Sequence, residues 1–290
     1  MKEANNKQPR NRIALVTDST CDLPDDLIKE HDIRLLPLTV VYPDRQYRDR
    51  YDILPEEVYA RMPEEIPSTS MPLAGEVAEL LENLKLEGFK EVIAILISSG
   101  LSGTHDMFKM IGHQVENLWV EVIDSLSLSM GLGFLVCEAA DQLKKNLKLE
   151  DIVLHLQRFR SRTKVFYVIP TLQYLRKGGR IGLVEGTIGE FLNIKPIISI
   201  NSEGKYFTHT KVRGRKASLQ KLLEIIRDSI GDKTVDLAVL HGGAYKEAQE
   251  LLENLKQAVP NLRRVSFSQI SPVLGVHTGP GLVGVAFCEV

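Results

Sequence analysis

The chain has 290 residues and a formal net charge of -2, with 43% hydrophobic and 26% charged residues. These values exclude a fibrous or wholly disordered protein, and they argue against a protein whose whole surface grips nucleic acid. No apolar stretch reaches the roughly 18–20 residues of a membrane helix. Cys21, Cys137 and Cys288 are widely separated, which predicts neither a disulfide framework nor a zinc site. The first residues are polar without the apolar core of a signal peptide, so we expect a soluble, cytoplasmic protein.

The first half of the chain alternates apolar runs with amphipathic segments. After a polar tail over 1–11, we expect strands at 13–17, 91–97 and 119–123, an apolar stretch at 33–42, and helices near 24, over 55–62, from 72, from 104 and after 125. Strands that alternate with helices favour a parallel sheet covered on both faces. We therefore predict an N-terminal α/β domain over 12–163.

The second half has a different pattern. We expect strands at 165–169, 194–200, 205–212, 235–240, 262–270 and 282–288, and helices near 216–230 and 245–259. The turn sequence over 201–204 joins two of these strands into a hairpin, which introduces antiparallel pairing. The sequence thus predicts a second α/β domain with a mixed sheet over 164–290. The expected fold class is α/β with two domains.

Two hydroxyl-rich loops are candidates for binding an anion. One runs from Ser98 to Thr104 after a predicted strand, and the other, over 68–72, opens the helix expected near Pro72. A helix start offers unpaired N–H groups, and hydroxyls add short donors, so the loops suit a carboxylate or a phosphate. Hydroxyl residues at helix starts are also ordinary caps, and this reading stays open for each loop alone.

Several catalytic motifs fail on inspection. The glycine pattern over 279–284 lies too near the C-terminus for a following βαβ unit, and Pro280 removes an N–H that a phosphate would need. The segment from Gly100 to Thr104 begins like a nucleophile elbow, but Thr104 stands where the second glycine is required. There is no phosphate-binding loop and no zinc-protease motif. We therefore expect no nucleotide, metal or other cofactor.

His277 stands in a Gly- and Pro-rich segment that we read as a loop before the last strand. A lone histidine is more often structural, but an imidazole there could donate a hydrogen bond to an anion. Two basic segments, 176–180 and 211–216, suit an acidic partner or a transferred phosphate as well as a plain solvated surface.

Together these segments resemble the DegV family of fatty-acid-binding proteins, whose members include the acyl-carrying subunits of bacterial fatty acid kinase. The resemblance covers the chain from about residue 13 to its end and depends on the order of seven segments rather than on any one of them. These are 16–20 with Leu23-Pro24, then 69–72, 97–104, 124–125, 174–181, 194–198 and 277–281.

The resemblance implies two α/β domains that hold a long-chain fatty acid in an apolar tunnel. It also implies that the ligand's carboxylate meets hydroxyls of both loops and the histidine near the C-terminus. The candidate residues are Thr69, Ser70, Ser98, Ser99, His277 and Thr278. Of the two serines in the second loop, Ser99 is the better candidate because it directly precedes Gly100. Met71 departs from the family, which often has glutamine there.

By the same resemblance the protein is not itself a catalyst. It presents the carboxylate to a separate ATP-dependent fatty acid kinase subunit, which forms an acyl phosphate, with Arg176, Arg180 and Arg213 as candidate docking residues. We expect no nucleic-acid partner and no transmembrane segment, and at most a transient contact with a membrane surface during lipid exchange.

Three other functions remain open from the residues alone. One is an enzyme for a small polar substrate, similar to the substrate domain of dihydroxyacetone kinases. Another is a serine hydrolase that uses Ser99 or Ser102 with His277, although no acidic partner can be assigned. The last is an interaction or regulatory protein in which lipid is structural.

Overall fold

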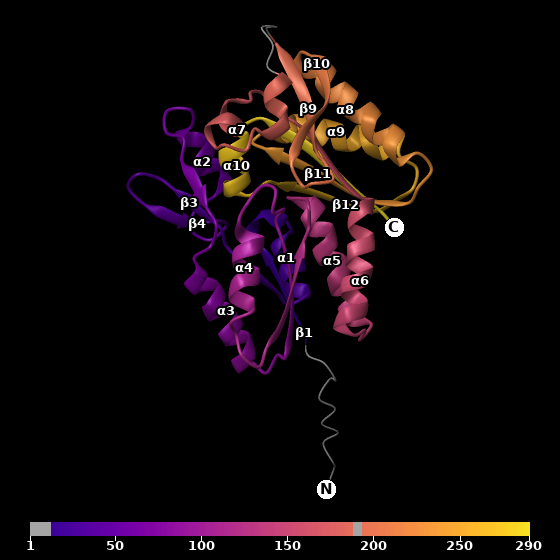
Figure 1. Ribbon diagram of the computed structural model, residues 1–290. Helices are drawn as coiled ribbons and strands as arrows, with labels where there is room; N and C mark the ends of the chain where they lie inside the picture. The colour runs from indigo at the N-terminus through magenta and orange to yellow at the C-terminus, as the bar shows by residue number, and fades with distance from the viewer. Residues whose placement is uncertain (1–12, 188–192) are drawn as a thin grey trace.

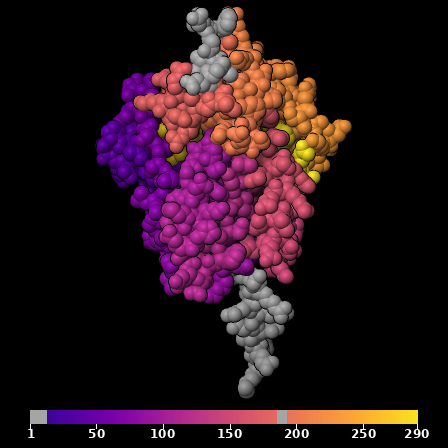
Figure 2. Space-filling view, viewed as in Figure 1, coloured from indigo at the N-terminus to yellow at the C-terminus, as the bar shows by residue number. Residues whose placement is uncertain are grey.

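The computed structural model describes residues 13–187 and 193–290, so the predicted polar tail over 1–11 lies outside the described residues. The described part of the chain forms two lobes, each built around its own sheet and stacked on the other (Figure 1). A smaller antiparallel sheet and its helix lie at the side of both lobes. Figure 2 shows these parts packed broadly against one another.

The first lobe contains a four-stranded sheet with the strand order β2-β1-β6-β7, in which every described pair is parallel. Its strands are β1 (Ile13–Asp18), β2 (Ile33–Leu36), β6 (Glu91–Leu96) and β7 (Trp119–Asp124). Its helices are η1 (Ser19–Cys21), α1 (Asp25–Glu30), α3 (Ala74–Leu86), α4 (Thr104–Gly112), α5 (Met130–Lys144), α6 (Leu149–Phe159) and η2 (Arg160–Arg162). Helix α6 was not among the elements expected from the sequence.

Helices cover both faces of this sheet, as predicted, and its central strands β1 and β6 are buried on both sides. Leu15 and Ile93 point into the core shared with α5 and α6, whereas Val16 and Val92 point into the core beneath α3 and α4. Strands buried on both faces read as continuous apolar runs, because alternate side chains all leave water. That is why these strands could be found from the sequence.

The side sheet has the order β4-β3-β5, with antiparallel pairing throughout. Its elements are β3 (Thr39–Val41), β4 (Gln46–Arg48), β5 (Ser68–Ser70) and the accompanying helix α2 (Pro55–Arg61). The prediction that 68–72 opens a helix is therefore wrong for its first three residues, since Thr69 pairs with Val40 across the sheet. Helix α3 begins only at Ala74, where the Glu76 carboxylate accepts a hydrogen bond from the backbone N–H of Leu73.

The second lobe contains a six-stranded mixed sheet with the order β10-β9-β8-β13-β11-β12. Its strands are β8 (Thr163–Val168), β9 (Ile194–Ile200), β10 (Tyr206–Arg213), β11 (Val235–Gly242), β12 (Leu262–Gln269) and β13 (Leu282–Glu289). Its helices are α7 (Gln173–Lys177), η3 (Gly182–Thr187), α8 (Arg215–Ile230), α9 (Tyr245–Ala258) and α10 (Pro272–Thr278). The predicted β9–β10 hairpin is confirmed, and only β11 and β12 pair in parallel.

Helix α10 lies where all three parts meet. Val273 and Val276 pack into the core of the side sheet, whereas Leu274 points into the core that joins the two lobes. His277 therefore belongs to a short buried helix rather than to the loop that the sequence suggested. The glycines and prolines around it mark the ends of the helix: Pro272 begins it, and Gly279, with φ of 69°, ends it.

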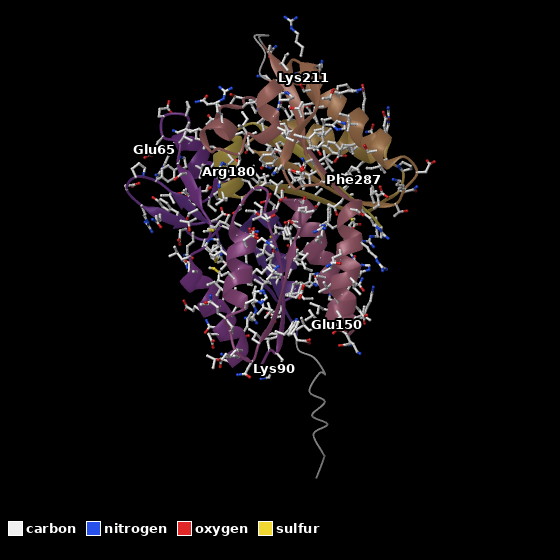
Figure 3. The ribbon with its side chains drawn as sticks, viewed as in Figure 1. Glu65, Lys90, Glu150, Arg180, Lys211 and Phe287 are labelled. Carbon is white, nitrogen blue, oxygen red and sulfur yellow. The ribbon has the colours of Figure 1, made fainter. Side chains whose placement is uncertain are left out.

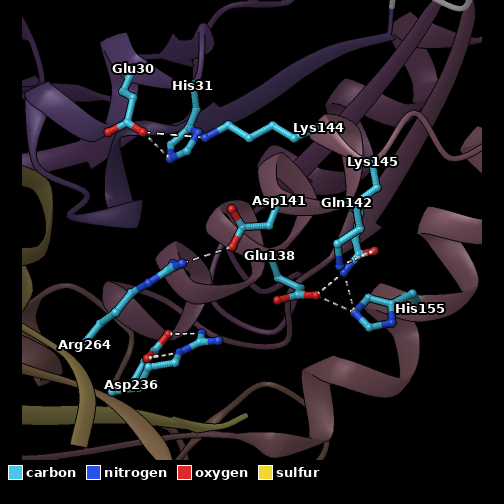
Figure 4. Close-up of polar contacts among 11 residues, drawn as sticks. Glu30, His31, Glu138, Asp141, Gln142, Lys144, Lys145, His155, Asp236 and Arg264 are labelled. Carbon is cyan, nitrogen blue, oxygen red and sulfur yellow. Dashed lines mark hydrogen bonds and ion pairs between the residues drawn. The ribbon is translucent and has the colours of Figure 1, made fainter.

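Charged side chains lie along one side of the junction between the lobes (Figure 4). Arg264 of β12 lies 3.5 Å from the Asp141 carboxylate on α5 and so joins the two lobes. The neighbouring pairs lie within single lobes: His155 contacts Glu138 in the first, and Arg263 contacts Asp236 in the second. Among the described residues no helix is long and apolar enough to span a bilayer. The position of the domain boundary at 163/164 stays a prediction.

Candidate functional site

The structure brings together two of the predicted site residues, Thr69 and His277, which are 208 positions apart in the chain. Thr69 Oγ1 lies 2.8 Å from His277 Nε2. The threonine comes from the edge strand β5 of the side sheet, and the histidine comes from the last turn of α10. Packing of α10 on the side sheet therefore creates the pair, and neither local segment could form it alone.

The His277 ring is held in a closely packed, neutral state. Its residue is 8% exposed, and burial, followed by the nearby charge of Arg180, lowers the histidine's pKa to about 4. A Cβ atom on Gly178 would lie 2.2 Å from His277 Nδ1, so the glycine is what lets the ring occupy this position. A neutral imidazole has one N–H, which it can donate either to the threonine or to a ligand.

Arg180 stands beside this pair and joins it to the loop that follows β6. Its guanidinium donates to the carbonyl of Gly178 at 2.7 Å and to that of Leu101 at 3.3 Å. Figure 3 shows Arg180 close to the junction of the lobes, whereas Lys211 lies at the far tip of the second lobe. Arg180 was predicted to dock a partner, and its position also puts a positive charge beside His277.

The serines of the loop have other protein partners. Ser98 is fully buried, and its hydroxyl donates to the carbonyl of Gly204 at 2.8 Å, which ties the loop to the β9–β10 turn. Ser99 is exposed, and its hydroxyl donates to the Asp124 carboxylate at 2.6 Å. A carboxylate ligand at Thr69 and His277 could reach Ser98 or Ser99 only if these hydroxyls turned from their present partners. The assignment of either serine to the ligand stays a prediction.

The remaining candidates occupy three different environments. Ser70 is exposed at the end of β5, and Arg176 and Arg213 are exposed on the second lobe. Thr278 is buried, and its hydroxyl donates to the carbonyl of Leu274 one turn earlier in α10. The Thr278 hydroxyl is therefore already paired within the helix.

An apolar cavity lies between the lobes next to this helix. Its volume is about 20 Å³, and it has no polar surface. Its walls are residues of α10 and its flanks, of β8, β11 and β13, and of the segment that leads into α5: Leu128, Ser129, Val165, Tyr167, Leu240, Ile270, Leu274, Thr278, Leu282 and Gly284. A space of this size admits about one water-sized sphere, so this is a narrow gap and not the open tunnel implied by the resemblance. An acyl chain would have to push these walls apart.

The arrangement suits an amphipathic ligand with a small anionic head. The Thr69 hydroxyl, the His277 imidazole and the Arg180 charge lie together, and the next residue after the histidine, Thr278, lines the apolar gap. Such donors can pair a carboxylate that would otherwise be costly to bury. The described residues contain no cluster of three or more His, Cys, Asp or Glu side chains that could hold a metal.

The geometry does not assemble a serine nucleophile with a histidine base. The hydroxyl bonded to His277 is that of Thr69, while Ser99 bonds Asp124 and Ser102 bonds Thr104. These contacts give no support to the hydrolase reading of the sequence.

Sequence reasoning missed residues that act through packing. Gly178 appeared only within a basic segment and one of the resembling segments, and Gly284 only as the end of the rejected glycine pattern, yet one makes room for His277 and the other lines the cavity. Asp22 and Ser129 were also missed, although they are joined by a buried hydrogen bond beside the cavity. The only sequence signal for any of these residues was the glycine pair at 178–179, which lies between basic residues.

Comparison with known proteins gives a consistent result. The sequence profile described as "Uncharacterised protein, DegV family" matches residues 12–290. A DegV domain-containing protein of Clostridium acetobutylicum is 45% identical over 274 residues, which cover 94% of this chain and 98% of the relative.

Two solved structures have nearly the same fold. A structure described as fatty acid binding of a DegV family protein from Thermus thermophilus superposes with a TM-score of 0.89 at 31% identity, covering 96% of this chain and all of the other. The structure of DegV, a fatty acid binding protein from Bacillus subtilis, gives a TM-score of 0.89 at 29% identity, covering 97% of this chain and all of the other.

Proposed function

The chain belongs to the DegV family, and we propose that it binds one long-chain fatty acid with the acyl chain between the lobes and the carboxylate at Thr69 and His277. The observation that carries this proposal is the Thr69–His277 pair, which lies next to Arg180 and one residue from Thr278, a wall residue of the apolar cavity. Fatty acid binding by the similar proteins of Thermus thermophilus and Bacillus subtilis supports it.

The acyl chain and the carboxylate contribute differently to the free energy of binding. Each buried methylene contributes about 0.8 kcal/mol, so a long chain supplies on the order of 10 kcal/mol before ordering costs. Opening the gap offsets part of this gain, because the apolar walls lose contact with each other. The carboxylate adds little net affinity, but its donors determine which end of the ligand lies at His277.

The proposal is tested by stripping the purified protein of lipid, reloading it with hexadecanoic acid and measuring its content by native mass spectrometry. We expect one acid per chain, and Thr69→Val or His277→Ala should weaken binding by about tenfold because the head loses a donor. Because the two residues form one pair, the double variant should cost less than the sum of both losses. Failure of the stripped protein to take up any fatty acid would overturn the proposal.

We further propose that the bound carboxylate is presented to a separate kinase. A carboxylate oxygen attacks the terminal phosphorus of ATP, the bond to ADP breaks, and an acyl phosphate results. Arg176 and Arg213 are exposed and suit contacts with an acidic partner, while Arg180 beside His277 suits the developing phosphate charge. On this proposal the chain carries its ligand and has no catalytic residue of its own.

Charge reversal separates docking from binding. Arg176→Glu and Arg213→Glu should lower acyl phosphate formation with an added ATP-dependent fatty acid kinase about tenfold or more, while fatty acid content stays at one per chain. Exposed Lys221 on α8, reversed to glutamate, serves as the matched control. Equal loss in the control, or loss of lipid in the two arginine variants, would contradict a docking role.

A further inference from the structure

A cleft lies at the opposite end of α10 from His277, and the fatty acid binding proposed above does not use it. Its volume is about 470 Å³, which is within the usual range for small-molecule sites. It opens at the carboxyl end of β12, which runs parallel to β11, and ligands of α/β sheets commonly bind at such ends. Three stretches of chain line the cleft: 22–25 at the start of α1, Arg50 with 54–56 at the start of α2, and 267–272 from the end of β12 to the start of α10.

The stretch after β12 brings buried polar atoms to this cleft that have no hydrogen-bond partner among the described residues. They are Ser268 Oγ, Gln269 Nε2 and Ser271 Oγ. Ser271 as a whole is only 4% exposed, and its hydroxyl lies beside the Asp22 carboxyl. Buried polar atoms nearly always have partners, because an unpaired one loses its bond to water and gains nothing in return. The amide N–H groups of Gln269 in particular need an acceptor.

The side chains around the cleft carry more negative than positive charge. Asp22, Asp25 and Glu56 line it, whereas Arg50 is the one basic residue among its described lining residues. Arg50 is already engaged, since it donates to the Asp25 carboxylate at 2.6 Å and to the carbonyl of Leu23 at 2.7 Å. In spite of Arg50, burial raises the pKa of Asp22 to about 6. The charges of Asp22 and Glu56 are therefore incompletely balanced, which favours a cation in the cleft.

These two carboxylates lie at different depths. Asp22 is 4% exposed and is held by the backbone N–H of Ser271, which donates to it at 2.8 Å. Glu56 is exposed in the first turn of α2. Both charges act on Tyr59 of the same helix, because its pKa is raised first by burial and then by Asp22 and Glu56. One carboxylate thus lies at the floor of the cleft and the other at its rim, both within reach of a single side chain.

We propose that this cleft binds a small hydroxylated amine, whose ammonium group pairs with Asp22 and Glu56 and whose hydroxyl groups bond the polar atoms of 268–271. The inference goes beyond fatty acid binding and does not depend on it. An ammonium group has only donors, so the Gln269 amide N–H needs the oxygen of a hydroxyl group. An anion is disfavoured by the two carboxylates, and a plain hydrocarbon would leave the buried polar atoms unpaired.

The test titrates glucamine, a polyol with one ammonium group, into 15N-labelled protein, with sorbitol as the counterpart in which a hydroxyl replaces the ammonium. Near pH 7 we expect glucamine to bind at least about tenfold more tightly than sorbitol, because only glucamine pairs with a carboxylate. The backbone amide signals over 268–271 should shift in both titrations. Glucamine alone should lower the Asp22 pKa from about 6, since a cation beside a carboxylate favours its charged form.

Two variants separate charge from hydrogen bonding. Glu56→Gln changes an exposed residue and should weaken glucamine binding about three- to tenfold, while sorbitol binding stays the same. Gln269→Leu removes the amide and should weaken the binding of both probes about three- to tenfold. Glu79→Gln is the matched control, because Glu79 is exposed on α3 and does not line the cleft. The control should change neither affinity.

Equal affinities for glucamine and sorbitol, or glucamine binding that neither Glu56→Gln nor Gln269→Leu weakens, would overturn the inference. Displacement of bound hexadecanoic acid by glucamine would also overturn it, because the probe would then act at the fatty acid site. We expect the fatty acid content to stay constant during the titration, which keeps the result independent of the proposed function.

Discussion

The two ends of α10 differ in the charge that lies beside their buried polar groups. At one end His277 Nε2 is bonded to Thr69 and the ring is packed against Gly178, so the ring has a fixed position, with Arg180 nearby. At the other end the backbone N–H of Ser271 donates to the Asp22 carboxylate. His277 Nδ1 and the Ser271 hydroxyl are both buried without a hydrogen-bond partner among the described residues. What differs is therefore the neighbouring charge, which is positive at the rigid His277 end and negative at the Ser271 end, so an anion is favoured only at the first.

The largest expected loss of affinity comes from a larger side chain in the cavity wall between the two ends of α10. Gly284 lines the cavity on β13, and Gly284→Val would place two methyl groups where the acyl chain has to pass. Excluding several methylenes should weaken hexadecanoic acid binding by on the order of 100-fold. Titration calorimetry measures the loss, and circular dichroism checks that the variant is folded. Unchanged affinity in a folded variant would show that the chain lies elsewhere.

A smaller effect should follow from disturbing the rigid end alone. Gly178→Ala would place a methyl group 2.2 Å from His277 Nδ1, so the ring would have to move. Because the backbone at Gly178 has φ of -77°, the alanine adds no backbone strain there. We expect binding of hexadecanoic acid to weaken about tenfold and the protein to lose about 1–3 kcal/mol of stability. Gly75→Ala on α3 is the matched control, since its new methyl group meets no atom within 4 Å. Similar losses of affinity in both variants would show that Gly178 has no specific role in ligand binding.

The smallest effect concerns protonation at the rigid end. Since burial lowers the pKa of His277 to about 4, its NMR ring signals should stay constant between pH 8 and pH 5. The unfolded chain takes up this proton near pH 6.5 and the folded chain only near pH 4, so His277 lowers the free energy of unfolding as the pH falls through this window. Asp22, whose pKa burial raises to about 6, contributes in the opposite direction. A His277 titration near pH 6.5 would mean that the ring is not packed as described.

Much of the architecture was readable because burial leaves a periodic signal. The strands of the parallel sheet are apolar on both faces, and helices such as α8 and α9 lie within a residue of their predicted starts. The segment at 68–70 was misread because hydroxyl residues suit both a helix start and an edge strand, and the pairing with β3 decides between them. His277 was assigned to a loop because a seven-residue helix between glycines and prolines carries little periodicity.

By itself, the sequence determined the α/β class, the mixed second sheet, the family resemblance and the candidates Thr69 and His277. These follow from local apolar periodicity and from short ordered motifs, which need no knowledge of distant neighbours. The tertiary structure alone decided that Thr69 meets His277, that Ser98 and Ser99 bond Gly204 and Asp124 instead, and that the cavity is narrow. The reason is physical: a contact between residues some two hundred positions apart depends on how three cores pack around α10, and no local pattern encodes that packing.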